Sequence, residues 1–446
     1  MMKRLAATAT AALLLCLSAG PVLAQATVRV ERNAVAAHMN FLAGPELQGR
    51  GSATRDEAIA AAYVASQFRL AGLTPVPGMD SYLQQVPVVI TTPSGEARLT
   101  VGDMTLTQGE DFAILTGGLG AAGGTVAVAP DPAALSTSAE VLMIAPPEGP
   151  GVRAVFGAAM RSGAKVVLMR RTDVLAGATA DGGSRDPVIR LAGDTPEAWD
   201  RLAAGAGGKV AAFDPGASDV VEGVTTNAIG WLPGTDPEAG TIMVSAHLDH
   251  IGVRSDGVVM YGANDDASGT VAVIELARAL SGTGPHRMNV MFVAYGSEEA
   301  GLLGSRYFVE NPPVALDTIK ANLEIEMIAD QDPQLPPGVM MMTGFERSNF
   351  GPELKARGAL IGPDPYPDQN FFQRSDNYAL ALRGVVAHTI SGWATIPTYH
   401  TPEDTIDNIN FDYMTQAIQS LVVPLTALAE GDFVPTWAEG GRPEGR

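Results

Sequence analysis

The feature that most constrains the fold of this chain is a regular alternation of short strand-like runs and helical runs from Thr225 onward. Strands that alternate with helices build a largely parallel sheet covered by helices. In chain order the runs lie at 241–246, 269–280, 289–295, 302–310, 323–328 and 384–390. Helical periodicity at 35–42, 56–70 and 413–428 indicates further packing helices. We therefore predict an α/β fold with a mostly parallel central sheet flanked by helices.

The stretch from residue 86 to residue 220 has a different texture. Short β-type runs alternate there with turns rich in glycine and proline, a helix is expected at 151–162, and no obvious catalytic cluster occurs. We predict that this stretch is an inserted, mostly β domain. The main domain is then discontinuous, at 25–85 and 221–432, and a C-terminal tail follows at 433–446.

The first 24 residues are typical of a secretory signal peptide. Lys3 and Arg4 precede an apolar run of leucines, and residues 21–24 form a small-residue cleavage site. The run is short for a membrane span, and Leu15 stands before Cys16 where lipid-anchored precursors carry a small residue. The sequence therefore predicts an exported protein, periplasmic or extracellular, with no stable membrane anchor.

The charge of the chain bears on its partners. The formal net charge is −20, whereas proteins that bind nucleic acid neutralise phosphates with lysine and arginine. Nucleic acid is therefore not expected as a partner, and the sequence leaves the oligomeric state open.

Histidines and carboxylates gather at the expected ends of strands. His247 ends one strand, Glu298 and Glu299 follow the next, and Glu326 lies in a third. Ligands of such sheets bind beyond the carboxyl ends of the strands. With Asp265 and His400, these residues offer imidazole and carboxylate ligands without thiolate, a set that suits zinc, with cobalt or manganese as substitutes. The order of the residues predicts a site for two Zn²⁺ ions.

The positions of these residues suggest which of them bind metal, which accepts a proton and which orients a ligand. Two histidines and three carboxylates suffice for two ions if one carboxylate is shared, and Asp265, in a loop of small residues, is the expected bridge. Two ions about 3.5 to 4 Å apart can lower the pKa of a bridging water toward about 7. Glu298, which is adjacent to Glu299, can then accept the proton of this water. Asp249, two residues after His247, is expected to orient that ligand through its other ring nitrogen.

The segments that carry these residues resemble those of the two-zinc aminopeptidase family, whose relatives include glutamate carboxypeptidase II, glutaminyl cyclase and the transferrin receptor. They are SAHLDH (245–250), GANDDASG (262–269), GSEEAGLLGS (296–305), NLEIEMI (322–328) and TYHTPEDT (398–405). The resemblance covers most of the expected mature chain. It implies that His247 and Glu326 hold one zinc, that Glu299 and His400 hold the other, that Asp265 bridges them, and that Glu298 is the general base.

The resemblance implies further features. A tyrosine at the position of Tyr399 would hydrogen-bond the developing oxyanion. The peptide bond after Asp265 would be cis, and the inserted stretch would resemble a protease-associated domain. Glu326 stands where many members have Asp. Asn377 stands where His is common, which puts a role for the neighbouring Arg374 in doubt.

Other charged residues near the motifs have simpler interpretations. Asp266 is expected to cap the helix that begins near Ser268. Asp404 either orients His400 or begins a turn, and His250 follows Asp249 close to the expected metals. His38, His286 and His388 are expected to be surface or packing residues. These interpretations leave the five ligands as the core of the site.

With the signal-like first residues, the resemblance implies an exported zinc aminopeptidase that removes N-terminal residues from peptides with a free N-terminus. A metal-bridged hydroxide would attack, and Glu298 would pass the proton to the leaving amine. Two other enzyme classes stay open on the same scaffold: a carboxypeptidase or dipeptidase, and a glutaminyl cyclase. A non-catalytic binding module, as in the transferrin receptor, is a further alternative.

Overall fold

The computed structural model describes residues 28–108, 111–116, 120–129, 140–144, 163–169, 188–191, 202–254 and 257–444. The expected signal peptide at 1–24 and the helix expected at 151–162 lie outside the described residues. Within the described ranges, no helix has both the length and the apolar character needed to cross a membrane.

The larger of two sheets is the frame on which the site is built. Its strands, in spatial order, are β1 (Leu83–Pro93), β10 (Ser218–Leu232), β14 (Asn289–Tyr295), β11 (Thr241–His247), β15 (Ile319–Glu326), β18 (Val386–Ser391), β16 (Met340–Met342) and β17 (Ile361–Pro363). The four central strands, β14, β11, β15 and β18, are parallel to one another. On either side of this group, β10 runs antiparallel to β14 and β16 runs antiparallel to β18, while β1 runs antiparallel to β10. The prediction of an α/β fold is confirmed, and the full sheet is mixed around a parallel centre.

Alternating side chains of the central strands face two separate cores. In β11, Ile242, Val244 and Ala246 pack into one core, while Met243 faces the other. The strand is buried over its whole length because helices cover both faces, which explains why its sequence is a continuous apolar run rather than an alternating one.

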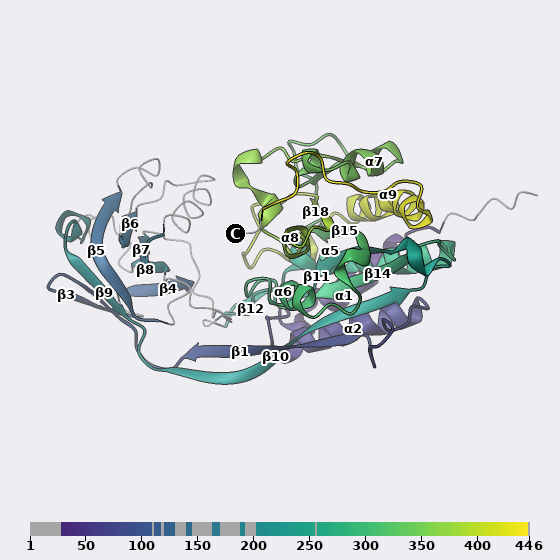
Figure 1. Ribbon diagram of the computed structural model, residues 1–446. Coiled ribbons are helices and arrows are strands. Elements are labelled where there is room, and N and C mark those ends of the chain that lie inside the picture. Colours follow the sequence, from purple (N-terminus) through teal and green to yellow (C-terminus); the bar gives the residue numbers. More distant parts are fainter. Residues whose placement is uncertain are drawn as a thin grey trace, which may run out of the picture.

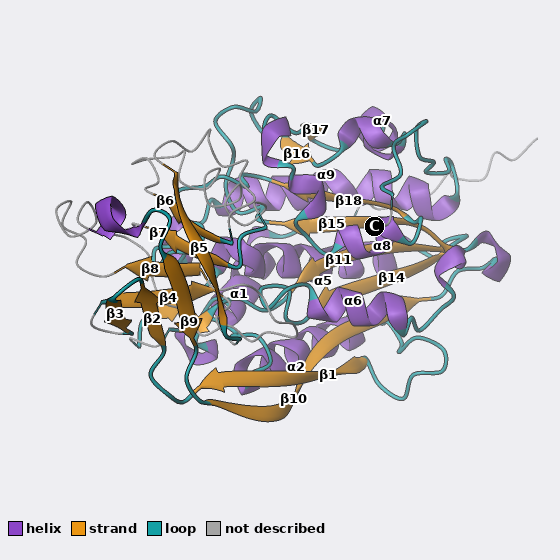
Figure 2. Cartoon of the chain, turned by 60° about the vertical axis from the view of Figure 1, so that its left-hand side comes forward, coloured by secondary structure: helices purple, strands orange, loops and turns teal. Residues whose placement is uncertain are grey.

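Helices cover both faces of this sheet (Figures 1 and 2). The helices that contribute to the first core are α1 (Arg32–Leu42), α2 (Arg55–Leu70), α5 (Ser268–Thr283), α7 (Phe350–Ala356) and α9 (Phe411–Glu430). The helices that contribute to the second core are α6 (Leu303–Glu310) and α8 (Asn377–Leu382). Thr54 begins α2 as a cap, because its side chain accepts a hydrogen bond from the backbone of Glu57.

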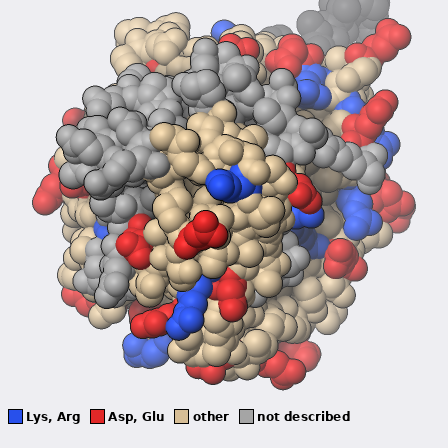
Figure 3. All heavy atoms as spheres, turned by 90° about the vertical axis from the view of Figure 1, so that its left-hand side faces the viewer, with Lys and Arg blue, Asp and Glu red and all other residues tan. Residues whose placement is uncertain are grey.

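A second sheet lies within the stretch predicted to be inserted. Its described strands, in spatial order, are β3 (Met104–Thr107), β2 (Arg98–Val101), β9 (Val210–Asp214), β5 (Ala122–Ala129), β6 (Val141–Ile144), β7 (Val166–Met169), β8 (Val188–Leu191) and β4 (Phe112–Thr116). A long ribbon of β1 and β10 leads from the main sheet to this one (Figure 1). On the face at this end of the molecule, acidic and basic side chains are interspersed among the described residues (Figure 3). The similarity to a protease-associated domain stays a prediction, as do the domain boundaries.

Candidate metal centre

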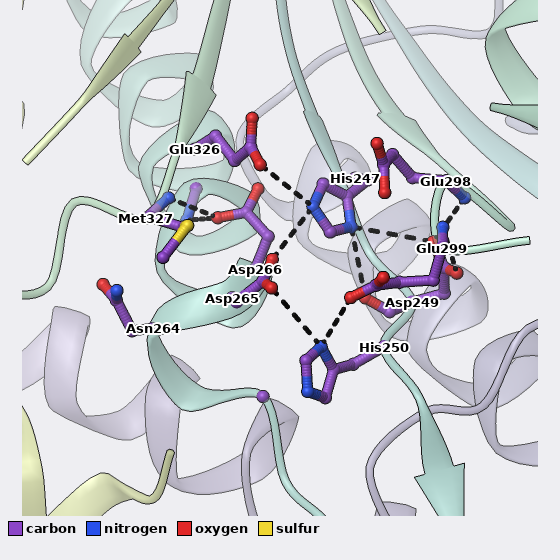
Figure 4. Close-up of polar contacts among 12 residues, drawn as sticks. His247, Asp249, His250, Asn264, Asp265, Asp266, Glu298, Glu299, Glu326 and Met327 are labelled. Atoms are coloured by element: carbon purple, nitrogen blue, oxygen red, sulfur yellow. Dashed lines mark hydrogen bonds and ion pairs between the residues drawn. The ribbon is translucent and has the colours of Figure 1, made fainter. Parts of the chain in front are cut away.

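Three neighbouring parallel strands bring distant parts of the sequence to one edge of the sheet. His247 is the last residue of β11 and pairs with Tyr295 at the end of β14, so Glu298 and Glu299 follow directly beside it. Glu326 ends β15 on the other side of β11. Asp265 comes from the loop before α5. Figure 4 shows these side chains converging on a common centre.

The converging atoms form two groups that share Asp265. In the first, His247 Nε2 lies 3.3 Å from Asp265 Oδ1 and 4.0 Å from Glu326 Oε1. In the second, His400 Nε2 lies 3.2 Å from Asp265 Oδ2 and 3.1 Å from Glu299 Oε1. All five ligands expected from the sequence therefore lie together, with Asp265 between the two groups.

The second group contains a residue that sequence reasoning did not include among the ligands. His250 Nδ1 lies 2.9 Å from Glu299 Oε1 and 3.9 Å from Asp265 Oδ2. The sequence held a signal for it, since His250 follows Asp249 within three residues of His247.

The donor set fits divalent metal ions. His247 Nε2, His250 Nδ1 and Asp265 Oδ2 are buried, and none of the three has a hydrogen-bond partner among the described residues. Buried polar atoms without hydrogen-bond partners are costly, and a cation bound where they converge would offset that cost. Nitrogen and carboxylate donors without thiolate are the ligands expected for zinc at a catalytic site.

The electrostatics of the centre also favour positive charge. Burial opposes the charged form of His400, but the carboxylates of Glu299 and Asp265 outweigh this effect and raise the pKa of His400 to about 10. Burial likewise works against the charge of Glu299, yet the positive charge of His400 lowers the pKa of that carboxyl to about 2. The Glu299 carboxylate thus remains ionised and available as a ligand.

Glu298 lies beside this centre and differs from its neighbour Glu299. Burial of its carboxyl group raises its pKa well above the usual value, and the charge of Glu299 adds to this effect. Its backbone N–H donates to Asp249 Oδ1 at 2.9 Å. The two adjacent glutamates therefore have opposite tendencies to hold a proton.

Asp249 supports both sides of the centre. The hydrogen-bonding contact of His247 Nδ1 is with the backbone carbonyl of Asp249, at 3.2 Å, while the Asp249 carboxylate is 3.7 Å away. That carboxylate accepts hydrogen bonds from Ser52 Oγ at 2.6 Å and from the backbone of Glu298 and Glu299. It therefore orients the Glu298–Glu299 turn more directly than it orients the imidazole.

Two further aspartates hold the loop that carries Asp265. Asp404 accepts hydrogen bonds from the backbone of Asn264 at 2.8 Å and of Asp265 at 3.1 Å. Asp266 Oδ1 accepts from the backbone of Gly269, in the first turn of α5, and of Met327. Asp266 therefore caps α5, which confirms that interpretation. Asp404 orients Asp265 rather than His400. The Asp265–Asp266 peptide bond is cis, as the resemblance implies.

Arg50 is a buried structural cation that sequence reasoning missed. Its guanidinium donates to the carbonyls of Leu248 at 2.8 Å, Tyr261 at 2.9 Å and Gly262 at 2.7 Å, and also to that of Leu42. Burial lowers its pKa to about 10, which leaves it charged at neutral pH. It ties the strand end that carries His247 to the loop before Asp265. A lone arginine between two glycines gave no clear signal in the sequence.

Glu57, in the first turn of α2, supports the turn that carries Glu298 and Glu299. Its Oε1 accepts hydrogen bonds from Thr225 Oγ1 at 2.6 Å and from Ser297 Oγ at 2.9 Å. Ser297 immediately precedes Glu298 and has a positive φ of 53°. The buried Glu57 therefore fixes the start of the Glu298–Glu299 turn.

A small pocket opens beside the candidate metal centre. Its lining includes Glu326, Met341, Phe371, Arg374, Ala394 and Tyr399. The Tyr399 ring stacks on His400, with 3.8 Å between ring centroids, and the Arg374 guanidinium lies over the Phe371 ring. The lining of the pocket is polar and apolar in about equal parts, and it includes one cation, Arg374, and one candidate ligand, Glu326.

The remaining histidines lie outside the centre. His38 contacts Tyr63 Oη at 2.9 Å, His286 contacts Glu430, and His388 packs against aromatic rings including Phe372. Their expected roles in packing are confirmed.

Comparison with known sequences agrees with this site. The profile of peptidase family M28 matches residues 227–425. Leupeptin-inactivating enzyme 1 of Streptomyces exfoliatus is 29% identical over 232 residues, 47% of this chain and 50% of that protein. Aminopeptidase YwaD of Bacillus subtilis is 30% identical over 183 residues, 40% of this chain and 38% of that protein. The chain thus spans about half or less of the length of these curated relatives.

Solved structures show the same fold. An aminopeptidase from Aneurinibacillus sp. strain AM-1 has a TM-score of 0.60 at 20% identity, covering 91% of this chain and 95% of that one. A zinc aminopeptidase from Bacillus subtilis has a TM-score of 0.59 at 17% identity, covering 93% and 98%. The chain has the fold of these solved aminopeptidases, and the profile of peptidase family M28 matches residues 227–425. The resemblance to the two-zinc aminopeptidase family is confirmed at this level.

We expect Arg50→Met to lower the free energy of unfolding by more than about 3 kcal/mol, because it leaves several buried carbonyls without donors. Arg55→Met, an exposed arginine at the start of α2, should change it by less than about 0.5 kcal/mol. Chemical denaturation of the zinc-loaded protein measures both. Equal effects of the two substitutions would contradict the role assigned to Arg50.

Proposed function

We propose that the chain is an exported zinc-dependent aminopeptidase that hydrolyses N-terminal residues from peptides. The observation that carries the proposal is the pair of histidine and carboxylate groups that share Asp265 at the edge of the sheet. Relatives that match part of this chain are named aminopeptidases, which supports the same activity. Export rests on the signal-like first 24 residues, and a relative named as a probable lipoprotein aminopeptidase, LpqL of Mycobacterium tuberculosis, is 31% identical over 213 residues.

The proposal assigns two zinc ions to the two groups. His247 and Glu326 would hold one ion, Glu299 and His400 the other, and Asp265 would contact both. Cobalt or manganese are possible substitutes, since the donor set does not exclude them. Zinc at such a site polarises a carbonyl and lowers the pKa of a bound water toward about 7. The distances within each group support this assignment, as does the buried His247 Nε2, which has no hydrogen-bond partner among the described residues.

Glu298 is proposed to be the general base and then the general acid. It lies next to a candidate ligand without belonging to either group, and the burial that raises its pKa suits a residue that takes up a proton and releases it. It would accept the proton of the attacking water and give it to the leaving amine. Asp249 and Glu57 keep the turn in place through the hydrogen bonds described above.

The pocket beside Glu326 is proposed to receive the first residue of the substrate. A free amino terminus is positively charged, and Glu326 and Glu299 place negative charge at the mouth of the site. Met341, Phe371 and Ala394 offer apolar surface for a side chain. Tyr399, which lines the same pocket, is proposed to hydrogen-bond the oxyanion. Arg374 lies in the same wall, where it would contact the substrate backbone.

The remaining stretches complete the proposal. The discontinuous segment 25–85 and 221–432 would form the peptidase domain, and residues 86–220 would form an inserted domain similar to protease-associated domains. The second sheet, which lies within that stretch, supports this division.

Glu298→Gln should lower kcat by about 10² to 10⁴, because Gln keeps the shape of the side chain but cannot accept the proton. Zinc content, measured by elemental analysis, should stay at the wild-type value. Glu310→Gln, the same chemical change on the exposed end of α6, is the matched control and should leave kcat unchanged. Substantial hydrolysis by Glu298→Gln would remove Glu298 from the role of base.

Asp265→Ala should lower the zinc content itself, since both groups lose a shared ligand. Elemental analysis after gel filtration measures this directly. Asp317→Ala, at an exposed carboxylate, should keep the wild-type content. Two ions still held tightly by Asp265→Ala would show that Asp265 is not a bridge.

The purified protein should release the first residue from aminoacyl amides with a free amino group, and not from amino-blocked ones. A chelator should abolish the activity, and added zinc should restore it. Cleavage of amino-blocked peptides at the carboxyl end would indicate a carboxypeptidase. Cyclisation of N-terminal glutamine would indicate a glutaminyl cyclase, and zinc-loaded protein without turnover would indicate a binding module.

A further inference from the structure

His250 occupies a place in the second group that the five expected ligands do not explain. Its Nδ1 and His400 Nε2 flank the same two carboxylate oxygens, Asp265 Oδ2 and Glu299 Oε1. These four atoms, one from each residue, all lie within 4.8 Å of one another. The group therefore presents two nitrogens and two oxygens around one small volume (Figure 4 shows three of the four residues).

The spacing of the four atoms is close to that of a tetrahedral metal site. Zinc binds nitrogen and carboxylate oxygen at about 2.0 to 2.2 Å, so neighbouring vertices of a tetrahedron around it lie roughly 3.3 to 3.6 Å apart. Four of the six separations among these atoms are 2.9, 3.1, 3.2 and 3.9 Å, on either side of this range. No large movement of the four side chains is needed for one ion to contact all of them.

The His250 Nδ1 atom lies at ion-pair distance from Glu299 Oε1, but neither ring nitrogen of His250 makes a hydrogen bond of good geometry within the described part of the chain. The side chain is fully buried, and neither Nδ1 nor Nε2 has a hydrogen-bond partner among the described residues. A buried imidazole without hydrogen bonds is costly, and a cation at Nδ1 removes part of that cost.

The chain holds this imidazole firmly in position. The backbone N–H of His250 donates to the Arg50 carbonyl at 3.1 Å, and the ring packs edge-on against His400. Gly262 lies so close that a Cβ there would fall 2.3 Å from His250 Cγ. Gly262 also has a φ of +60°, which favours glycine. A ligand fixed in this way needs little reorganisation to bind an ion.

We propose that His250 is a metal ligand, so that the second ion is held by four protein side chains: His250, Asp265, Glu299 and His400. The first ion has three, His247, Asp265 and Glu326. This inference rests on the proposed function, since it concerns the same metal centre. Sites with four protein ligands are closed, whereas sites with three keep a position for water or substrate. The second ion is therefore the firmly held one, and the first ion is the exchangeable one with room for a reactant.

A crystal structure of the zinc-loaded wild-type protein, with anomalous data at the zinc edge, tests the ligand directly. We expect His250 Nδ1 within about 2.0 to 2.2 Å of the second zinc. A nitrogen more than about 3 Å from either ion, bonded to Glu299 instead, would overturn the proposal.

Zinc affinity in solution gives a second measurement, made by competition with a chromogenic chelator. Wild-type protein should show one tight and one weaker site. In His250→Ala the tight site should weaken by more than about 100-fold, beyond the 10- to 100-fold typical of outer-shell partners. His250→Asp, whose carboxylate can replace Nδ1 as a donor, should recover much of that loss. A smaller loss in His250→Ala would assign His250 to the outer shell and overturn the proposal.

A matched control removes a different buried histidine. His388→Ala takes an imidazole from the core beside Phe350 and Phe372, where it bonds to Ser348, and should leave both zinc affinities unchanged. Equal loss in the two alanine variants would also count against the proposal. If His250→Ala does not fold, as judged by thermal unfolding, the wild-type crystal structure and His250→Asp decide the question.

These measurements separate the ligand proposal from the proposed function, because none of them reads turnover. Zinc bound to His250 Nδ1 in a protein that hydrolyses no peptide would leave the ligand assignment standing and remove the aminopeptidase. Peptide hydrolysis by a protein in which His250 Nδ1 does not contact zinc would support the aminopeptidase and remove the ligand assignment.

Discussion

The structure depends on a concentration of negative charge that the protein alone does not neutralise. Asp265, Glu298, Glu299 and Glu326 meet at one edge of the sheet, with Asp249, Asp266 and Asp404 directly behind them. Buried carboxylates in such numbers repel one another and lose hydration, so their approach is favourable only where protons or cations offset the charge. The nearby histidines supply part of that positive charge when protonated. Divalent ions supply more, and in doing so bring the imidazoles into their neutral, ligating form.

Much of the surrounding structure serves to keep these groups in place. Asp249 and Glu57 fix the turn that carries Glu298 and Glu299, Asp404 holds the backbone around Asp265, and Arg50 joins two segments through carbonyls. These contacts use backbone groups more than side chains, so the loops are fixed in conformation and not only in position. Such support by neighbouring groups is what metal ligands need in order to bind with defined geometry.

The parts predictable from the sequence were those governed by local pattern. The β14 strand was predicted at the bounds observed, and α2 and α9 within two residues at each end, because apolar periodicity decides long elements. The five ligands were found because each stands in a recognisable segment at the end of a strand or in a glycine-containing loop. Arg50 and Glu57 were missed because their partners lie far away in the sequence, and no local pattern encodes a carbonyl brought near by folding. The position of His250 near the metals could be predicted from the sequence, but its role as a ligand could not, because the neighbouring residues do not determine the direction of its ring.

The ribbon of β1 and β10 has a consequence for how this protein can change over evolutionary time. Pro93 pairs with Ser218, so the stretch between them leaves and rejoins the main sheet at a single point. Replacing or enlarging that stretch need not shift the register of the strands that end at the metal centre. An insertion or deletion within that stretch is therefore compatible with an unchanged geometry of the residues at the metal centre.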